Sequence, residues 1–213
     1  MITKAFHTIV FDLGGVIVDL DVPRCVANFK RLMGEANMRN ILGIDDEGEG
    51  VVAVSASTKQ LMHDFEYGNI SIDGFLQAVT AYCHPGTTTE QVREAWLSMI
   101  GDLPQERLDY IASLRKAGYK TILLSNSNDL HWAIQEQYNL DSYFDHVFAS
   151  QQLHMAKPNR EIYEHVVREA QTDCAHTIYV DDLEKNRRAG ELFAGWKTVE
   201  NIDELKAVLD HEC

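Results

Sequence analysis

Residues 7–16 form the sequence His7-Thr8-Ile9-Val10-Phe11-Asp12-Leu13-Gly14-Gly15-Val16, a β-branched and aromatic run that leads into an aspartate and two glycines. An apolar run of this length, ended by a glycine pair, is typical of a buried parallel strand. Asp12 would then lie at the carboxyl end of the strand, where open α/β sheets bind their ligands. A single acidic residue after a strand is more often a helix N-cap or a turn former, so the prediction depends on the rest of the chain.

The composition is that of an ordinary globular protein with an acidic surface. Of 213 residues, 45% are hydrophobic and 24% are charged, and 33 acidic against 19 basic residues give a net charge of -14. Such a surface repels nucleic acids and anionic membranes, so we expect neither as a partner. No apolar stretch has the length of a signal-sequence core or a membrane span, which predicts a cytoplasmic protein. We expect a monomer or a weak homodimer.

Residues 21–97 have the periodicity of helices and show no strand pattern. Helices are predicted at Val26–Met33, Leu61–Tyr67, Ile72–Tyr82 and Val92–Met99. An acidic, glycine-rich loop, Gly43–Gly50, separates the first helix from the second. We therefore expect residues 21–97 to form a helical insertion that stands over the ligand-binding edge of the sheet.

The remaining residues, 1–20 and 98–213, alternate between strand and helix. After the first strand, strands are predicted at Lys120–Ser125, His146–Ser150, Thr177–Val180 and Lys197–Val199, and helices at Gln105–Ala117, from Asp129 through Tyr138, from Met155-Ala156-Lys157-Pro158 onward, at Glu184–Phe193 and at Ile202–Leu209. Pro158 is expected in the first turn of its helix. This alternation, with right-handed crossovers, predicts an α/β fold in which a three-layer, Rossmann-like sandwich surrounds a parallel sheet.

Polar residues at four strand ends fall on one edge of the predicted sheet: Asp12, Ser125-Asn126, Lys157 and Asp181-Asp182. Phosphoryl transfer needs these types together, because it uses a carboxylate nucleophile, donors for phosphate oxygens, a cation and metal-binding carboxylates. Three carboxylates and one lysine sum to about -2, a charge that would repel phosphate until a divalent ion neutralises it. Ligands that are all oxygens favour Mg²⁺.

These residues, in this order, resemble the motifs of the haloacid dehalogenase superfamily over essentially the whole chain. The four motifs are Phe11-Asp12-Leu13-Gly14-Gly15-Val16, Leu123-Leu124-Ser125-Asn126, Lys157-Pro158 and Tyr179-Val180-Asp181-Asp182. The helical insertion is similar to the helical cap of that superfamily. Two further segments resemble phosphatases of the α-D-glucose-1-phosphate type and the phosphatase domain of soluble epoxide hydrolase: Ser125–His131 and Glu66–Ser71.

The resemblance implies a role for each motif residue. Asp12 would be the nucleophile that becomes an aspartyl phosphate, and Lys157 would bridge Asp12 and the phosphate. The Ser125 side chain and the Asn126 backbone would hold phosphate oxygens. The complete set of expected substrate-binding residues is Gly14, Gly15, Ser125, Asn126, Asn128, His131 and Lys157.

The metal ligands follow from the same resemblance. Asp182 would bind Mg²⁺ together with Asp12 and the Gly14 carbonyl. Asp181 and Asn186 would contact the ion through water or would hold the residues that bind it. Taken singly, an acidic pair at this place is more often the N-terminal turn of a helix. Four such clusters in the right order favour the site.

The sequence departs from the superfamily at Gly14, where most of its phosphatases carry a second aspartate that serves as general acid and base. General acid catalysis contributes about 10²–10⁴-fold, so its absence favours substrates with good leaving groups, such as sugar 1-phosphates or acyl phosphates. The α-D-glucose-1-phosphate type is similar in having glycine here. Water or a cap residue could replace the acid, and the candidates are His63, Glu66 and His131.

The sequence favours a Mg²⁺-dependent phosphatase over three other functions. A haloacid dehalogenase uses the same nucleophile on carbon, but it has no use for the metal-binding pair Asp181-Asp182. A phosphomutase needs the acid that Gly14 lacks. A sugar-phosphate-binding protein without turnover is the alternative from another class, although the loss of one general acid slows catalysis and does not abolish it.

Overall fold

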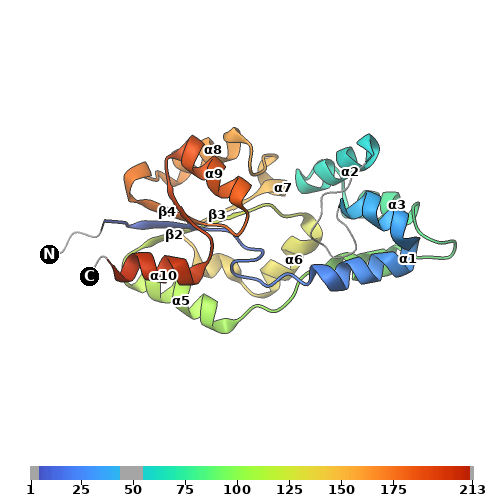
Figure 1. Cartoon of the computed structure of the whole chain (residues 1–213), viewed down its shortest axis with the longest axis horizontal. Helices are drawn as coiled ribbons and strands as arrows, with labels where there is room; N and C mark the ends of the chain where they lie inside the picture. The colour runs from blue at the N-terminus through green and yellow to red at the C-terminus, as the bar shows by residue number, and fades with distance from the viewer. Residues whose placement is uncertain (1–4, 44–54, 212–213) are drawn as a thin grey trace.

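The computed structural model describes residues 5–43 and 55–211, so the predicted loop Gly43–Gly50 lies outside them except for Gly43. Within these residues the centre is a five-stranded, all-parallel sheet with the order β3-β2-β1-β4-β5 (Figure 1). The strands are β1 (Thr8–Phe11), β2 (Lys120–Ser125), β3 (His146–Ala149), β4 (Thr177–Val180) and β5 (Lys197–Val199). The predicted α/β fold with a parallel sheet is confirmed.

The central strand β1 places Asp12 at the carboxyl edge of the sheet. Phe11, its last residue, is in register with Leu123 of β2 and Val180 of β4. The Asp12 N–H donates to the Val180 carbonyl oxygen at 2.8 Å. Because neighbouring strands run parallel, their carboxyl ends meet here, and so do the polar residues that follow them.

Helices cover both faces of the sheet, because successive apolar side chains of β1 point to opposite faces and each face must be buried. Ile9 and Phe11 point to one face, where α5 (Gln105–Lys116) and α10 (Ile202–Asp210) pack. Val10 points to the other face, where α8 (Arg160–Ala170) and α9 (Glu184–Ala194) pack. Figure 1 shows these two layers above and below the strands. The remaining core helices are α6 (Asp129–Gln137), α7 (Ser150–Leu153), η1 (Leu140–Tyr143) and η2 (Cys174–His176).

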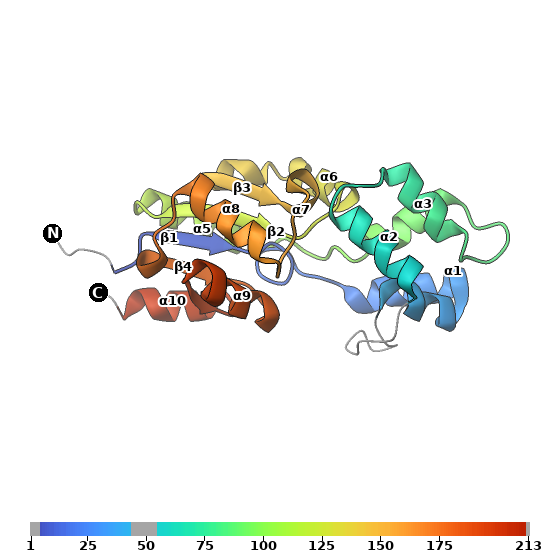
Figure 2. The same cartoon turned by 90° about the horizontal axis from the view of Figure 1, so that it is seen from above.

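Four helices form a separate cluster beyond the carboxyl edge of the sheet (Figure 2). They are α1 (Val22–Leu42), α2 (Ala56–Glu66), α3 (Ile72–Thr80) and α4 (Thr89–Leu97). Their core is aromatic: the rings of Phe65 and Phe75 stack at 3.7 Å between centroids, and Trp96 packs edge-on at 4.8 Å from Phe75. No helix in the described part of the chain is long and apolar enough to cross a membrane. The division of the chain into an α/β core, residues 1–20 and 98–213, and a helical cap, residues 21–97, stays a prediction.

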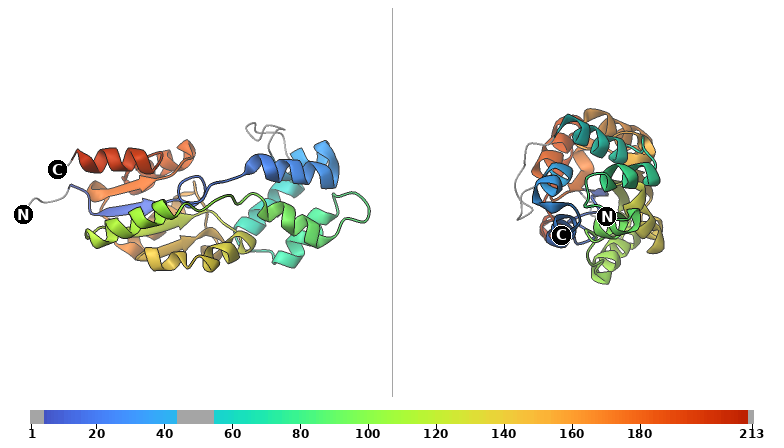
Figure 3. Two further views of the ribbon diagram at one scale, coloured as in Figure 1. Left: turned by 90° about the horizontal axis from the view of Figure 1, so that it is seen from below. Right: turned by 90° about the vertical axis from the view of Figure 1, so that its right-hand side faces the viewer.

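Two chain segments lie side by side where the core continues into this helical cap. The Asp21 N–H donates to the Met99 carbonyl at 2.7 Å, and Leu20 and Ile100 form an antiparallel bridge. The Gly101 N–H donates back to the Asp19 carbonyl at 2.8 Å. The amino end of β1 and the carboxyl end of α10 lie at the opposite end of the core (Figure 3).

The prediction that Pro158 stands in the first turn of a helix is wrong. Helix α8 begins at Arg160, and Lys157 and Pro158, joined by a cis peptide bond, lie in the turn before it. The Asn126 side chain accepts from the Lys157 N–H and donates to the Lys157 carbonyl, both at 2.8 Å. These two bonds hold the Lys157 backbone outside a helix. The third strand also ends one residue early, because Ser150 opens α7.

Candidate active site

Lys157 joins the carboxylates of Asp12 and Asp181. Its Nζ lies 2.8 Å from Asp12 Oδ1 and 2.7 Å from Asp181 Oδ2, and its side chain is 1% exposed. The Leu13 N–H donates to the same Asp12 oxygen at 2.7 Å. Among the described residues nothing donates to Asp12 Oδ2, so this oxygen is available to a ligand.

Burial and charge set the pKa values of these three groups. Burial raises the pKa of Asp12 to about 7, an effect that the Asp181 charge reinforces and Lys157 opposes. Burial disfavours the Lys157 charge as well, but the two carboxylates together raise the pKa of this lysine. For Asp181, hydrogen bonds and the Lys157 charge outweigh burial and lower the pKa. The site therefore contains a fixed cation and a surplus of negative charge that a bound metal ion would offset.

Asp181 has both carboxylate oxygens occupied by protein donors. Oδ1 accepts from the Leu183 N–H at 2.9 Å and from Asn186 Nδ2 at 3.0 Å. Oδ2 accepts from Lys157 and from the Tyr179 hydroxyl. Sequence reasoning missed Tyr179, although a tyrosine in a fully buried strand needs a partner for its hydroxyl. Asp181 thus orients Lys157, consistent with its predicted place behind the metal ligands.

Asp182 faces Gly15 across a very narrow gap. A Cβ atom at Gly15, whose φ is +76°, would lie 2.4 Å from Asp182 Oδ2, so only glycine fits beside this carboxylate. Ligand oxygens of Asp12, Asp181 and Asp182 lie within 4.8 Å of one another. Burial, followed by the Asp181 charge, raises the pKa of Asp182. An all-oxygen donor set with surplus negative charge fits a hard divalent cation.

Ser125 and Asn126 end β2 beside this cluster. Ser125 is 2% exposed, and its hydroxyl contacts the Asn126 carbonyl at 3.3 Å. The Asn126 carboxamide, by contrast, holds the Lys157 backbone and contacts the Glu66 carboxylate of the cap. Because its side chain is engaged by these protein groups, only the backbone of Asn126 is left for the predicted contact with phosphate.

Asn128 and His131 connect the core to the cap. Asn128 caps α6 by accepting from the His131 N–H at 3.1 Å, and its Nδ2 lies 3.2 Å from His131 Nδ1. His131 Nε2 lies 3.3 Å from the Trp96 carbonyl of α4, which can only accept. The imidazole therefore carries its proton on Nε2, and burial lowers its pKa to about 4. A neutral ring with both nitrogens engaged is poorly suited to the general-acid role considered for His131.

A cavity of about 150 Å³ lies next to the residues that follow Asp12. Gly14, Ser125, Asn126, Ser127 and His131 supply its polar lining, and the rest is mainly apolar: Leu13, Val18, Leu20, Met99, Ile100, Leu103 and Leu140. An engineered cavity of about this volume holds one benzene-sized ring. The space beside the candidate nucleophile thus suits a small substrate.

The cap segment Glu66-Tyr67-Gly68 docks on the core. Ser150 Oγ donates to the Glu66 carbonyl at 2.8 Å, and Asn159 Nδ2 contacts the Tyr67 hydroxyl at 2.5 Å. Burial raises the pKa of the Glu66 carboxyl. His63, another candidate for the missing acid, stacks on Tyr67 at the exposed side. Among the three residues considered as the missing general acid, Glu66 is the one that contacts Asn126, a residue of the predicted phosphate-binding turn.

Comparison with known proteins assigns the chain to a family. The model of the haloacid dehalogenase-like hydrolases matches residues 6–193. A D-ribitol-5-phosphate phosphatase of Bacteroides thetaiotaomicron is 31% identical over 191 residues, which cover 86% of each chain. A sesquiterpene phosphatase of Aspergillus oryzae is 36% identical over 78 residues, which cover 36% of this chain and 39% of the relative.

Solved structures give the same result. A family enzyme of Bacteroides thetaiotaomicron, crystallised with magnesium and inorganic phosphate, superposes with a TM-score of 0.75 at 28% identity, covering 92% of this chain and 93% of that one. A predicted hydrolase of this family from Porphyromonas gingivalis gives 0.79 at 28% identity, covering 96% and 98%. The narrower types suggested by the sequence are not among these matches. The chain belongs to the haloacid dehalogenase-like hydrolase family.

Proposed function

We propose that the protein is a Mg²⁺-dependent phosphatase of small phosphorylated metabolites with Asp12 as its nucleophile. The arrangement that supports this most directly is Asp12 held by Lys157, with Asp182 beside it against Gly15. The relatives named as phosphatases, and the related enzyme crystallised with magnesium and phosphate, support the same activity.

The chemistry follows from the positions of these side chains. Asp12 attacks the phosphorus atom, the bond to the leaving alcohol breaks, and the phosphoryl group passes to the carboxylate. Lys157 fixes Asp12 and compensates the negative charge of the transferred group, while Ser125 and the Asn126 backbone would hold phosphate oxygens. Water then attacks the phosphorus of the aspartyl phosphate, which releases inorganic phosphate and restores Asp12.

Asp12, Asp182 and the Gly14 carbonyl would hold Mg²⁺, with Asp181 and Asn186 behind them. When bound, the ion neutralises charge on the phosphate oxygens. Asp182 is the direct carboxylate ligand in this proposal because the protein already occupies both oxygens of Asp181.

For the substrate we propose a sugar or polyol phosphate, with sugar 1-phosphates preferred. Gly14 has no side chain that could protonate the departing oxygen, and an anomeric oxygen leaves more readily than an alkyl one. The relative that acts on D-ribitol 5-phosphate supports the polyol class, although its substrate is an alkyl ester.

A second candidate is the phosphate of an apolar alcohol. Most of the cavity wall is apolar, and the shorter match is to a sesquiterpene phosphatase.

Hydrolysis of p-nitrophenyl phosphate with and without Mg²⁺ tests the activity, with Asp12→Asn as the variant. We expect Mg²⁺-dependent turnover that Asp12→Asn abolishes, because the amide cannot attack phosphorus. Binding of phosphate without any turnover would instead indicate a protein that only binds sugar phosphates. Dehalogenation of a 2-haloacid without Mg²⁺ would indicate the dehalogenase reaction.

Four substrates then define the class: glucose 1-phosphate, glucose 6-phosphate, D-ribitol 5-phosphate and an isoprenyl monophosphate. Faster hydrolysis of glucose 1-phosphate than of glucose 6-phosphate is the expected result. A preference for an alkyl ester would mean that another residue supplies the proton or that cap contacts set the specificity. A clear preference for the isoprenyl ester would favour the apolar candidate.

A further inference from the structure

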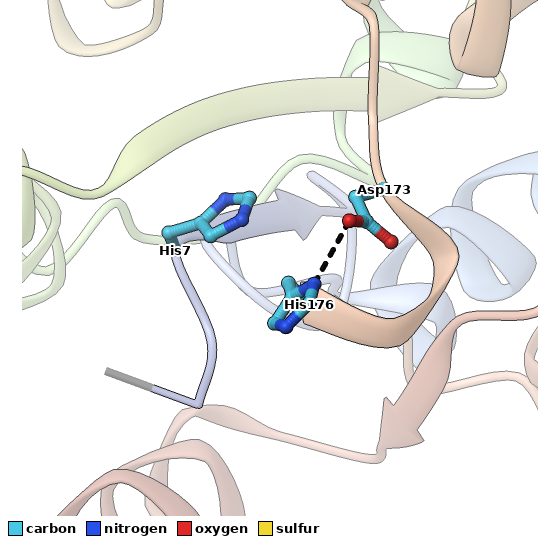
Figure 4. A group of neighbouring side chains, drawn as sticks. All are labelled: His7, Asp173 and His176. Carbon is cyan, nitrogen blue, oxygen red and sulfur yellow. Dashed lines mark hydrogen bonds and ion pairs between the residues drawn. The ribbon is translucent and has the colours of Figure 1, made fainter. Parts of the chain in front are cut away.

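Two histidines lie side by side at the amino end of the sheet, opposite the edge that carries Asp12. Thr8 of β1 is in register with Thr177 of β4, so the residues just before them, His7 and His176, are neighbours as well. The His7 N–H donates to the His176 carbonyl at 3.1 Å. Residues in register on parallel strands project to the same side, which brings both rings together (Figure 4).

Asp173 completes a group of three potential ligands. Its Oδ1 accepts from the Ala175 N–H at 2.9 Å, and its Oδ2 lies 2.9 Å from His176 Nδ1. Ligand atoms of His7, Asp173 and His176 all lie within 4.8 Å of one another. Asp173 is the N-cap of η2, and the bond from the Ala175 N–H to its side chain orients the carboxylate toward the two rings.

We propose that His7, Asp173 and His176 form a second metal site, which takes Zn²⁺ or a similar transition-metal ion. Two imidazoles and a carboxylate are a donor set that zinc uses, with water in the open position, whereas Mg²⁺ prefers oxygen ligands alone. This site is distinct from the carboxylate cluster, because it stands at the other end of β1 and β4.

The geometry needs only a small adjustment to bind the ion. Ligands about 2.0–2.1 Å from a tetrahedral zinc ion lie about 3.4 Å from one another. Since the three donor atoms all lie within 4.8 Å of one another, no pair has to change its separation by more than about 1.4 Å. The two rings are stacked at 5.1 Å between centroids, an orientation that rotation about the side-chain bonds can change. The His176 and Asp173 side chains are 43% and 52% exposed, which allows this rotation and lets the ion enter.

An ion at this place would tie the start of β1 to the turn before β4. His7 follows closely on the first described residue, and Asp173 and His176 lie in the segment between α8 and β4. The site therefore should stabilise the fold without taking part in phosphate chemistry.

The test is a zinc titration of the tag-free protein in saturating Mg²⁺, followed by calorimetry and by thermal unfolding. We expect one Zn²⁺ per chain and a rise in Tm of about 3–6 °C when free zinc is tenfold above its Kd. His7→Gln, His176→Gln and Asp173→Asn should each weaken zinc binding at least about tenfold.

Three control variants separate this site from other zinc ligands. His211→Gln removes an exposed histidine elsewhere, Cys174→Ser removes the thiol inside η2, and Asp182→Asn disables the carboxylate cluster. All three should keep the zinc-dependent rise in Tm. The proposal is overturned if the wild type shows no rise in Tm, if His7→Gln, His176→Gln and Asp173→Asn keep the full rise, or if Asp182→Asn abolishes it. Phosphatase activity plays no part in these readouts, so failure here leaves the proposed function untouched.

Discussion

Asp181 and Asp182 are adjacent, but the protein holds their oxygens to very different degrees, which predicts two distinct phenotypes. Asp182→Asn removes a carboxylate open to the cation, so the apparent affinity for Mg²⁺ should fall at least about tenfold with little loss of stability. Asp181→Asn removes a charged acceptor from Lys157 and Tyr179, although Lys157 keeps its contact with Asp12, and should lower the free energy of unfolding by about 1–3 kcal/mol. Mg²⁺ titration of turnover, together with urea unfolding, measures both.

The matched control is Glu184→Gln, which alters an exposed carboxyl on the same segment that forms an ion pair with Arg188. It should change neither quantity appreciably, because an exposed ion pair contributes little. A larger loss of Mg²⁺ affinity in Asp181→Asn than in Asp182→Asn would reverse the proposed assignment of the ligand.

Glu66 is suited either to protonate the leaving group or to position Asn126, and the choice of substrate separates these roles. A proton donor matters for a poor leaving group and hardly at all for p-nitrophenol. If Glu66 is the donor, Glu66→Gln should lower turnover of an alkyl phosphate by about 10²–10⁴-fold and leave p-nitrophenyl phosphate nearly unchanged.

Equal losses on both substrates would assign Glu66 to positioning alone. The matched control is Gln60→Glu, at an exposed position earlier on α2, where the side chain donates to Asp64 on its own helix. This change adds a carboxylate to the exposed side of the same helix, and neither substrate should respond to it.

The residues that sequence order could identify are those that follow strands, such as Asp12 after β1 and Asp181 after β4, although Lys157 comes only after β3 and the short helix α7. Asp12, Lys157, Asp181 and Asp182 were predicted to come together because parallel strands share a carboxyl edge, and the structure places them within direct contact or a few ångströms. The contact between Glu66 of the cap and Asn126 of the core joins positions 60 residues apart. It could not be predicted, because the spacing of apolar residues along the chain carries no information about such a contact.

At the scale of elements, Gly68 allows the cap loop to approach the core closely. Its φ is +67°, and a Cβ atom there would lie 2.2 Å from the Gln151 carbonyl oxygen. Gly68→Ala should therefore push the loop away from α7, raise KM and destabilise the protein by more than the backbone strain of about 1–2 kcal/mol.

Gly86→Ala is the control that separates strain from clash. Gly86 has a similar φ of +90°, yet a Cβ atom there would meet nothing within 4 Å. It should show only the backbone cost and an unchanged KM, as measured by urea unfolding and steady-state kinetics. Equal effects of the two variants would mean that the loop does not depend on this close contact.

Most elements whose pattern is local were predicted well, and elements fixed by distant contacts were not. The exception among the cap helices is α1, which extends from Val22 to Leu42 across a kink at Gly34, well beyond the predicted Val26–Met33. Buried parallel strands are short continuous apolar runs, and the cap helices carry regular apolar spacing, so both appear in the sequence. The start of α8 could not be predicted, because Asn126, 31 residues away, keeps Lys157 out of the helix. A proline after a strand has no local feature that distinguishes these two cases.

At the scale of the whole molecule, the cap touches the core at three places. The paired segments near Asp21 and Met99 form the covalent connection, and Glu66 and Tyr67 dock beside α7. His131 of α6 contacts the Trp96 carbonyl of α4. Because Met99 and His131 line the cavity next to Gly14, separation of cap and core would open that cavity to solvent.

The His131 contact makes the stability of this assembly depend on pH. Its pKa is about 4 in the folded protein because of burial, against about 6.5 in the unfolded chain, so the unfolded state binds more protons between these values. The stability cost is therefore absent above about pH 6.5, grows as the pH falls, and is complete below about pH 4, reaching at most about 3 kcal/mol.

His131→Gln removes this titration while keeping an amide that can donate to the Trp96 carbonyl. The variant should be equally or less stable than the wild type at neutral pH, and it should gain relative to the wild type as the pH falls from 6.5 toward 4, the window set by the lowered pKa. Urea unfolding across this range measures the difference, with His211→Gln as a control at an exposed position. A difference between wild type and His131→Gln that stays constant with pH would show that the imidazole is protonated at this interface without cost, and the cap contact would then not depend on its neutral form.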